Sequence, residues 1–152
     1  QKIEALLDAG IGACYLRQPE IAAIVQQALR FFDEGQHPQP RYCLLAWCIM
    51  PNHVHVLFKA LAPHRLLDIV HSWKSYTSNA INKQLQRSGA LWQPDYFDRR
   101  MRDDAHLSAT LAYIHHNPVS AGLVHEAQAW LFSSAYQHWE RDLLGRINAD
   151  KP

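Results

Sequence analysis

The densest candidate for chemistry in this 152-residue chain is a pair of histidines, His53 and His55, separated by one residue. They lie in a run of aliphatic and aromatic residues, 47–58, that is typical of a β-strand pair. Side chains alternate along a strand, so both imidazoles point to one side while Val54 and Val56 point to the other. Two imidazoles on one face can share a divalent metal ion, but an isolated pair of this kind is more often two half-exposed surface histidines.

The second candidate is a tyrosine–asparagine pair, Tyr113 and Asn117, near the end of a predicted helix. The two residues are four apart and therefore lie one above the other on the same flank. An amide oxygen one turn from a phenol could complete a metal's coordination and hold the hydroxyl beside the ion. The alternative is a boundary aromatic followed by a helix terminator before Pro118.

The elements that must position these residues can be predicted from hydrophobic spacing. Residues 3–10 have a helix-like spacing and predict a short helix that ends near Gly10. The remaining pattern predicts helices over 19–32 and 65–85, strands over 41–50, 53–59 and 96–102, and a last helix from Asp103 or Asp104 to about His116. A tight turn at 51–52 joins the first two strands.

This order predicts an α+β fold, a ferredoxin-like sandwich with an antiparallel sheet and helices packed on one side of it. We expect one domain over residues 1–152, with 123–152 as a tail packed on the body. Only about three strands are visible, whereas such sheets usually have four or more. The pattern therefore predicts that the first strand is missing from this chain.

Charge and composition narrow the possible classes of protein further. The chain has a net charge of +1, but residues 64–102 hold seven Lys and Arg against three Asp and Glu. Trp73 and Trp92 are interleaved with these cations, which suits a surface for single-stranded nucleic acid. Taken alone, however, the pattern favours a solvated face plus core aromatics. No apolar run is long enough to span a membrane and no signal pattern begins the chain, so we expect a cytoplasmic protein. The three cysteines have no CxxC pair and are expected to be reduced and mostly buried.

Four blocks occur in order: MPNHVHVLF, WKSYT, WQPDYFDR and AYIHHNPVSAGLV. Together they closely resemble the REP-associated tyrosine transposases, relatives of bacterial insertion-sequence transposases within the HUH endonuclease superfamily. The resemblance covers nearly the whole chain, from about Ala5 to Ser134. A strand ahead of the helix predicted at Ile3 is part of the family pattern and is expected to be absent here.

The resemblance implies a role for each matching residue. His53, His55 and Asn117 would hold a divalent metal ion, magnesium or manganese, and Tyr113 would be the nucleophile. Lys74, Arg99 and Arg100 fall in blocks expected to contact DNA, with Trp73 and Trp92 as stacking partners. The expected partners are hairpin-forming repeat DNA in single-stranded form and no membrane, the expected location is the bacterial cytoplasm, and the protein would be a monomer or a homodimer.

The expected reaction is cleavage and rejoining of single-stranded DNA through a 5′-phosphotyrosine. A phenol with a pKa of about 10 needs help to lose its proton, and three histidines are candidate bases by proximity: His106, His115 and His116. A catalytically silent nucleic-acid-binding module of the same fold is the main alternative. A zinc deaminase or zincin protease is disfavoured because neither HxE with PCxxC nor HExxH occurs.

Overall fold

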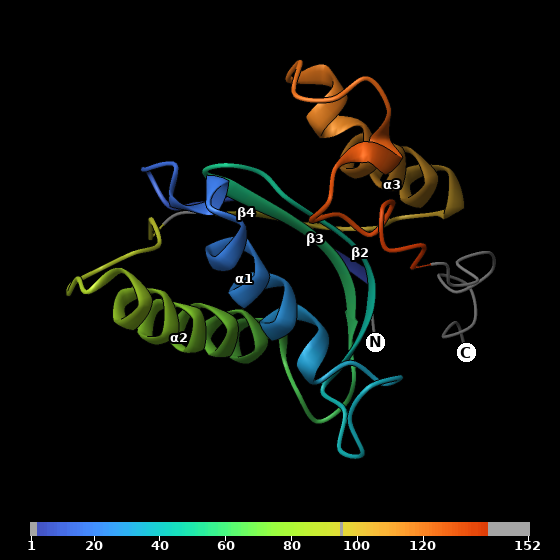
Figure 1. Cartoon of the computed structure of the whole chain (residues 1–152). Helices are drawn as coiled ribbons and strands as arrows, with labels where there is room; N and C mark the ends of the chain where they lie inside the picture. Colours follow the sequence, from blue (N-terminus) through green and yellow to red (C-terminus); the bar gives the residue numbers. More distant parts are fainter. Residues whose placement is uncertain (1–2, 95, 140–152) are drawn as a thin grey trace.

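The computed structural model describes residues 3–94 and 96–139. The described residues form an antiparallel sheet of four strands in the order β2-β3-β1-β4 (Figure 1). The elements are β1 (Ile3–Gly10), α1 (Pro19–Phe31), β2 (Tyr42–Ile49), β3 (His53–Ala60), α2 (Leu66–Leu85), β4 (Phe97–Arg100) and α3 (Asp104–Ser120), with short 3-10 turns at Tyr15–Arg17 and Ala127–Ala129. The order β1-α1-β2-β3-α2-β4 with this strand arrangement is ferredoxin-like, as predicted.

The N-terminal segment corrects the prediction of a helix over residues 3–10 and of a missing first strand. Ile3–Gly10 is the strand β1, which pairs with β3 on one side and β4 on the other. Both faces of this inner strand are covered: Ala5 is buried on the α3 side and Leu6 is buried on the opposite side. A bulge between Leu6 and Ala9 also breaks the two-residue alternation. Apolar residues on both sides of a bulged strand therefore imitate a helical spacing.

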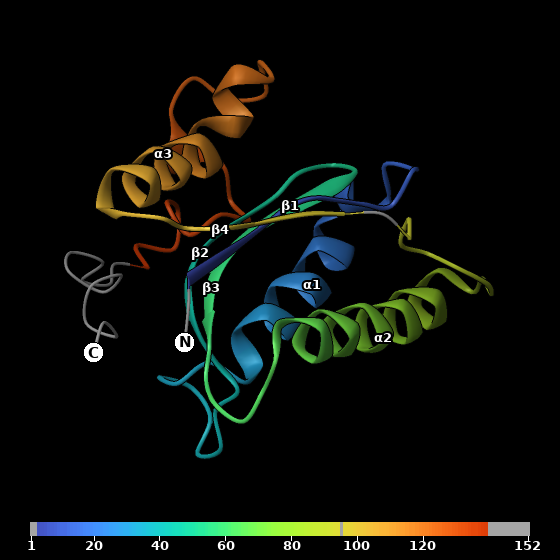
Figure 2. The ribbon, with the colours of Figure 1, turned by 180° about the vertical axis from the view of Figure 1, so that it is seen from behind.

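The helices cover both faces of the sheet, not one as predicted. α1 and α2 lie side by side on one face, and α3 lies on the other, where it packs against β2 and β3 (Figures 1 and 2). Each face has its own hydrophobic core. Residues that alternate along one strand therefore serve two different layers.

A hydrogen-bonded aromatic cluster holds the α1/α2 layer to the sheet. The hydroxyl of Tyr42 donates to the carbonyl of Ala28 (3.1 Å) and accepts from the indole N–H of Trp73 (3.0 Å) and the backbone N–H of Phe32 (3.3 Å). The ring of Trp73 packs edge-on against Phe58, with centroids 4.9 Å apart. Burial raises the pKa of Tyr42 to about 12, so this hydroxyl keeps its proton in neutral solution.

The helix α3 begins as predicted but ends one turn later. Asp103 caps its N-terminus, and the side chain accepts from the backbone N–H of His106 (2.7 Å). Pro118 lies inside the helix and is buried, so its packing offsets the lost N–H bond. The true stop is Gly122 at φ 74°, where Leu123 donates its N–H to the carbonyl of Pro118 (2.9 Å).

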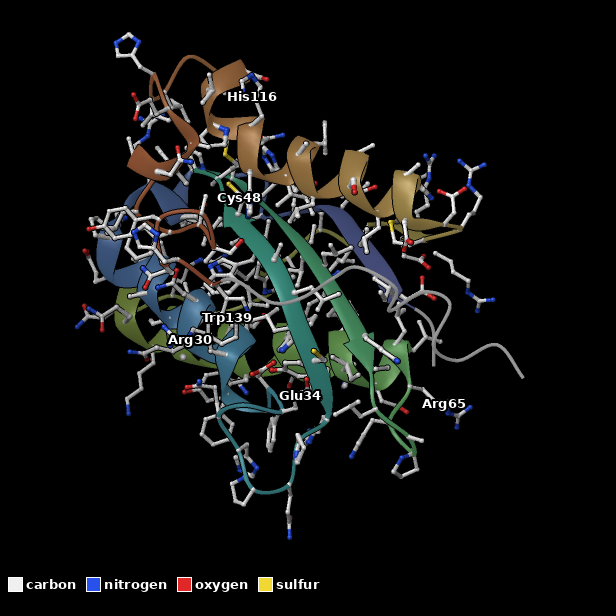
Figure 3. The ribbon with its side chains drawn as sticks, turned by 90° about the vertical axis from the view of Figure 1, so that its right-hand side faces the viewer. Arg30, Glu34, Cys48, Arg65, His116 and Trp139 are labelled. Atoms are coloured by element: carbon white, nitrogen blue, oxygen red, sulfur yellow. The ribbon has the colours of Figure 1, made fainter. Side chains whose placement is uncertain are left out.

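The segment after α3 packs along the outer edge of β2. Ser133 bridges Cys48 in antiparallel fashion, and the backbone N–H of Ser134 donates to the carbonyl of Trp47 (3.0 Å). Trp139, which Figure 3 labels, packs edge-on against Trp47, with centroids 5.2 Å apart. The segment thus lies against the edge of β2 up to residue 139, and residues 140–152 of the predicted tail lie outside the described part.

The three cysteines are free thiols, with Cys43 and Cys48 buried and Cys14 exposed. No helix in the described residues has the length and apolar character needed to cross a bilayer.

Candidate active site between the histidine strand and the third helix

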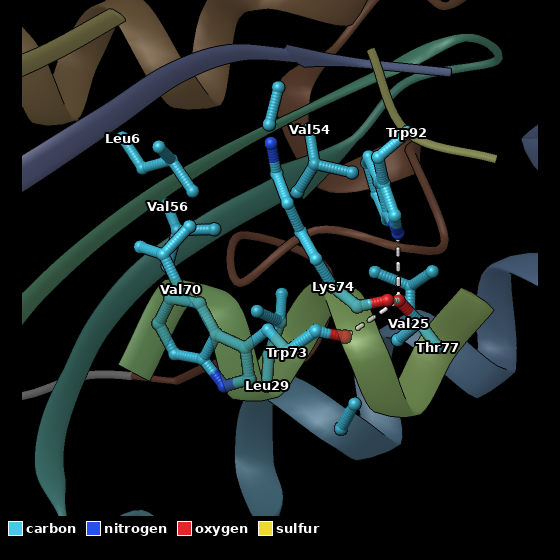
Figure 4. A pocket seen from close by; sticks show the side chains of 12 residues that line it. Leu6, Val25, Leu29, Val54, Val56, Val70, Trp73, Lys74, Thr77 and Trp92 are labelled. Carbon is cyan, nitrogen blue, oxygen red and sulfur yellow. Dashed lines mark hydrogen bonds between the residues drawn. The ribbon is translucent and has the colours of Figure 1, made fainter. Parts of the chain in front are cut away.

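The two histidines of β3 face the α3 layer. Val54 and Val56, which alternate with them, line the interior between the sheet and the helices α1 and α2 (Figure 4). The rings of His53 and His55 meet nearly at right angles, with centroids 4.9 Å apart. His55 is fully buried, whereas His53 is half-buried at the start of the strand. The predicted placement of both imidazoles on one face is confirmed.

The turn before β3 orients the ring of His53. The Nδ1 of His53 lies 2.8 Å from the side-chain oxygen of Asn52. Because an amide oxygen can only accept, this contact favours the tautomer with its proton on Nδ1, in which the lone pair of the neutral ring is at Nε2. Such a bond to the distal nitrogen is the usual way to orient a metal-binding histidine. Sequence reasoning treated Asn52 only as a turn residue, although its position directly before His53 was a usable signal.

The tyrosine of α3 lies against His55, the buried member of the histidine pair. The ring of Tyr113 meets that of His55 at 71°, with centroids 5.6 Å apart. Tyr113 is 51% exposed, so the phenol is accessible to a large substrate. Asn117 follows one turn later on the same helix and is half-buried. The fold therefore brings together Tyr113 and the two histidines, which are 58 or more positions apart in the chain.

The donor set suits a metal ion that prefers nitrogen and oxygen ligands. His53 presents Nε2, and the Nε2 of His55 is buried beside it. Cys48 pairs directly across from His55 on β2 and lies beneath α3 (Figure 3), but burial raises its pKa to about 12. It is therefore a thiol, whereas a thiolate is the sulfur form that binds metals. No cluster of three or more His, Cys, Asp or Glu suited to a metal occurs in the described part of the chain.

The three histidines predicted as candidate bases occupy different surroundings. His115 has its Nε2 2.7 Å from the hydroxyl oxygen of Ser134, and burial lowers its pKa. His106, at the start of α3, accepts through Nδ1 from the backbone N–H of Arg102 (3.2 Å). His116 is exposed on α3. The bond between His115 and Ser134 ties the tyrosine helix to the β2 edge, a link that sequence reasoning missed because the two residues are distant from the histidine motif.

The predicted DNA-contacting aromatics lie on the other side of the sheet. Trp73 is only 7% exposed and belongs to the core, so the prediction that it stacks on DNA is wrong: its ring is already packed against Tyr42 and Phe58. Trp92 is half-buried and donates its indole N–H to Thr77 (2.9 Å, Figure 4). Lys74 donates to the carbonyl of Gln93 (3.2 Å).

The two predicted arginines of β4 differ in direction. Arg100 pairs with Glu4 across the sheet, with Nε 3.3 Å from the carboxylate. Arg99 pairs with Ala5 and its guanidinium lies 5.3 Å from the ring centroid of Phe97. Ala5 belongs to the core beneath α3, so Arg99 shares the face of the histidines and Arg100 does not.

Comparison with known proteins places this chain in a family. The sequence model of the family described as "Transposase IS200 like" matches residues 16–117. A REP-associated tyrosine transposase of Escherichia coli K12 is 28% identical over 101 residues, which cover 64% of this chain and 57% of that protein. A Haemophilus influenzae protein described in the same terms is 28% identical over 113 residues, 68% of this chain and 62% of that one. The chain thus spans about six-tenths of the length of these relatives.

Solved structures support the fold. One is a REP-associated tyrosine transposase bound to a REP hairpin, with a TM-score of 0.67 and 17% identity over 89% of this chain and 76% of that one. A transposase-like protein from Deinococcus radiodurans has a TM-score of 0.51 and 23% identity over 77% of this chain and 89% of that one. At these identities the likeness bears on the fold alone.

Proposed function

The chain belongs to the IS200-like transposase family, and from this premise we propose that it cleaves and rejoins single-stranded DNA at hairpin-forming repeats, with Tyr113 as nucleophile. The observation that carries the proposal is the position of the Tyr113 ring over His55, 5.6 Å between centroids. Core packing would account for a buried phenol, but this phenol is half exposed above a buried imidazole. A binding module would not require that juxtaposition.

The proposed step is a displacement at phosphorus. The Tyr113 oxygen forms a bond to the scissile phosphorus as the phenolic proton passes to a base, and the bond from phosphorus to the 3′ oxygen breaks. The leaving 3′ oxygen takes up a proton and becomes a free 3′-OH, while the 5′ side of the DNA remains on the tyrosine as a phosphodiester. Because one phosphodiester bond replaces another, a 3′-OH can reverse the step without an external energy source.

A divalent ion, magnesium or manganese, would be held by His53, His55 and Asn117. When bound, it would supply positive charge to a phosphoryl oxygen and stabilise the transition state. The residues' own contributions are distinct: Asn52 orients the ring of His53, and α3 holds Tyr113 against His55. The contact between His115 and Ser134 holds that helix at the edge of β2.

The test is a covalent-adduct assay with a labelled hairpin oligonucleotide carrying single-stranded flanks, in manganese or magnesium. We expect a protein–DNA adduct that survives a denaturing gel and is absent with Tyr113→Phe, with His53→Ala and in excess chelator. Tyr76→Phe is the matched control, since Tyr76 is a 61% exposed tyrosine on α2. An adduct that persists in Tyr113→Phe would assign the nucleophile elsewhere. Hairpin binding without any adduct would favour a silent binding module.

A further inference from the structure

The face of the sheet that bears the histidines continues beyond α3 onto β4. α3 packs against β2 and β3, and all four residues of β4 are exposed. Phe97 is 52% exposed although it is a large apolar ring. An exposed phenylalanine on a strand edge, beside a candidate active site, is a feature that packing does not explain.

The strand register shows where Phe97 points. Phe97 pairs with Leu7 on β1, and Leu7 packs toward the core beneath α3. Leu7 lies between the pairs Leu6–Val56 and Ala9–Val54, so it is level with His55. Phe97, Leu7 and His55 therefore form a row across three strands on one face, and the outer members are two strand spacings, about 10 Å, apart.

Charge is divided between the two faces of β4. On the histidine face, the guanidinium of Arg99 lies 5.3 Å from the Phe97 ring centroid. On the opposite face, Arg100 is paired with Glu4, and Asp98 shares that face because it pairs with Leu6. The histidine face thus combines a ring with a cation, whereas the other face combines a cation with two carboxylates.

We propose that Phe97 and Arg99, here named the β4 ledge, bind one unpaired nucleotide of the substrate strand next to the scissile phosphate. The inference rests on the proposed function. The ring offers a stacking surface for a base of any identity, and the adjacent guanidinium offers a charge for the neighbouring phosphate. The β4 ledge is continuous with the row through His55, where the proposed function places single-stranded DNA. The expected occupant of the ledge is therefore single-stranded nucleic acid.

The test measures binding separately from cleavage. The full chain is titrated in chelator with a fluorescent hairpin that carries single-stranded flanks, and a second series places 2-aminopurine at successive flank positions. We expect Phe97→Leu to weaken binding by about 5- to 150-fold and to remove 2-aminopurine quenching at one position, with Phe97→Trp restoring both. Phe31→Leu is the matched control, because Phe31 is 58% exposed at the end of α1.

The arginines supply a second, sharper comparison. Arg99→Gln should lower the slope of log Kd against log salt by about 0.7, while Arg100→Gln, on the other face of the same strand, should leave the slope unchanged. Equal decreases of the salt slope in the two arginine variants would contradict the proposed role of the β4 ledge, even if the adduct assay succeeds. So would a Phe97→Leu variant whose Kd is within about twofold of the wild-type value. If the wild-type chain binds none of the flanked hairpins, the proposed function is itself wrong, and so is the proposed role of the β4 ledge.

Discussion

The two faces of the sheet are built for different purposes. The face under α1 and α2 is filled by large rings whose polar atoms are hydrogen-bonded, as at Trp73 and Tyr42. The opposite face is covered by α3 over β2 and β3 and exposes Tyr113 and Phe97 by about half. Because side chains alternate along β3, the strand contributes to both faces. Val54 and Val56 lie in the layer under α1 and α2, here called the packed face, and the two histidines lie on the α3 face, here called the open face. We therefore expect that stability and the proposed chemistry can be changed separately.

The largest expected effect on stability is from Trp73→Ala in the packed face. The ring is 7% exposed and meets Tyr42 and Phe58 at 5.0 and 4.9 Å between centroids. Its removal should lower the free energy of unfolding by about 3–5 kcal/mol, measured by urea denaturation followed by circular dichroism. Tyr113→Ala is the counterpart on the open face and should change that free energy by less than about 0.5 kcal/mol. Similar losses in both variants would show that the two faces are not separable in this way.

A smaller effect is expected for Tyr42→Phe, which removes one oxygen from the packed face. The indole N–H of Trp73 and the carbonyl of Ala28 lose this partner, while the N–H of Phe32 keeps its bond to the carbonyl of Arg30. The loss should cost about 1–3 kcal/mol. The effect has a pH signature. Since the folded pKa is about 12 and the ordinary value is 10.0, the unfolded chain loses this proton first, and stability should fall as pH rises between those values. Urea midpoints measured from pH 9 to 12 should fall less steeply in the variant, and parallel curves would contradict the assignment.

The packed face was largely predictable from sequence, and β1 shows why part of it was not. Helical spacing identified α1 and α2 because each buries a single stripe. β1 has no such single stripe: Ala5 faces one core, Leu6 faces the other, and a bulge follows. A spacing rule that assumes one buried face cannot identify an inner strand with two. The end of α3 was misplaced for a related reason, because burial of Pro118 outweighs its local preference.

At the candidate site, the shared face of His53 and His55 could be predicted from sequence, whereas the contacts that support the site could not. The alternation rule placed His53 and His55 on one face, since it depends only on local geometry. The contribution of Ser134 depends on the C-terminal segment pairing with β2, and no local pattern predicts which distant segment covers an edge. The opposite directions of Arg99 and Arg100 follow from the same alternation, but only once the register with β1 is known.

On the open face, Ser134→Ala tests the link between α3 and the sheet. The hydroxyl accepts from the backbone N–H of Trp47 (3.0 Å) and contacts His115 at 2.7 Å. Its loss should lower the free energy of unfolding by about 1–2 kcal/mol and should reduce adduct formation beyond that loss, because Tyr113 is two residues from His115. Ser120→Ala, an exposed serine at the end of α3, is the control. A stability loss with adduct formation unchanged in folded protein would mean that the link does not position the tyrosine.

The smallest effect is expected at the start of α3. Asp103 accepts from the N–H of His106 and caps the helix, so Asp103→Ala should cost about 1 kcal/mol, whereas Asp103→Asn should restore most of it because an amide oxygen also accepts. Both are read by urea denaturation. Tyr113 lies about ten residues beyond the cap, and α3 is separately held by Ser134. If the open face positions its tyrosine from the sheet edge, the cap variant should form adduct at the wild-type rate wherever it is folded. A cap variant that loses adduct while Ser134→Ala retains it would place the control of Tyr113 at the helix start instead.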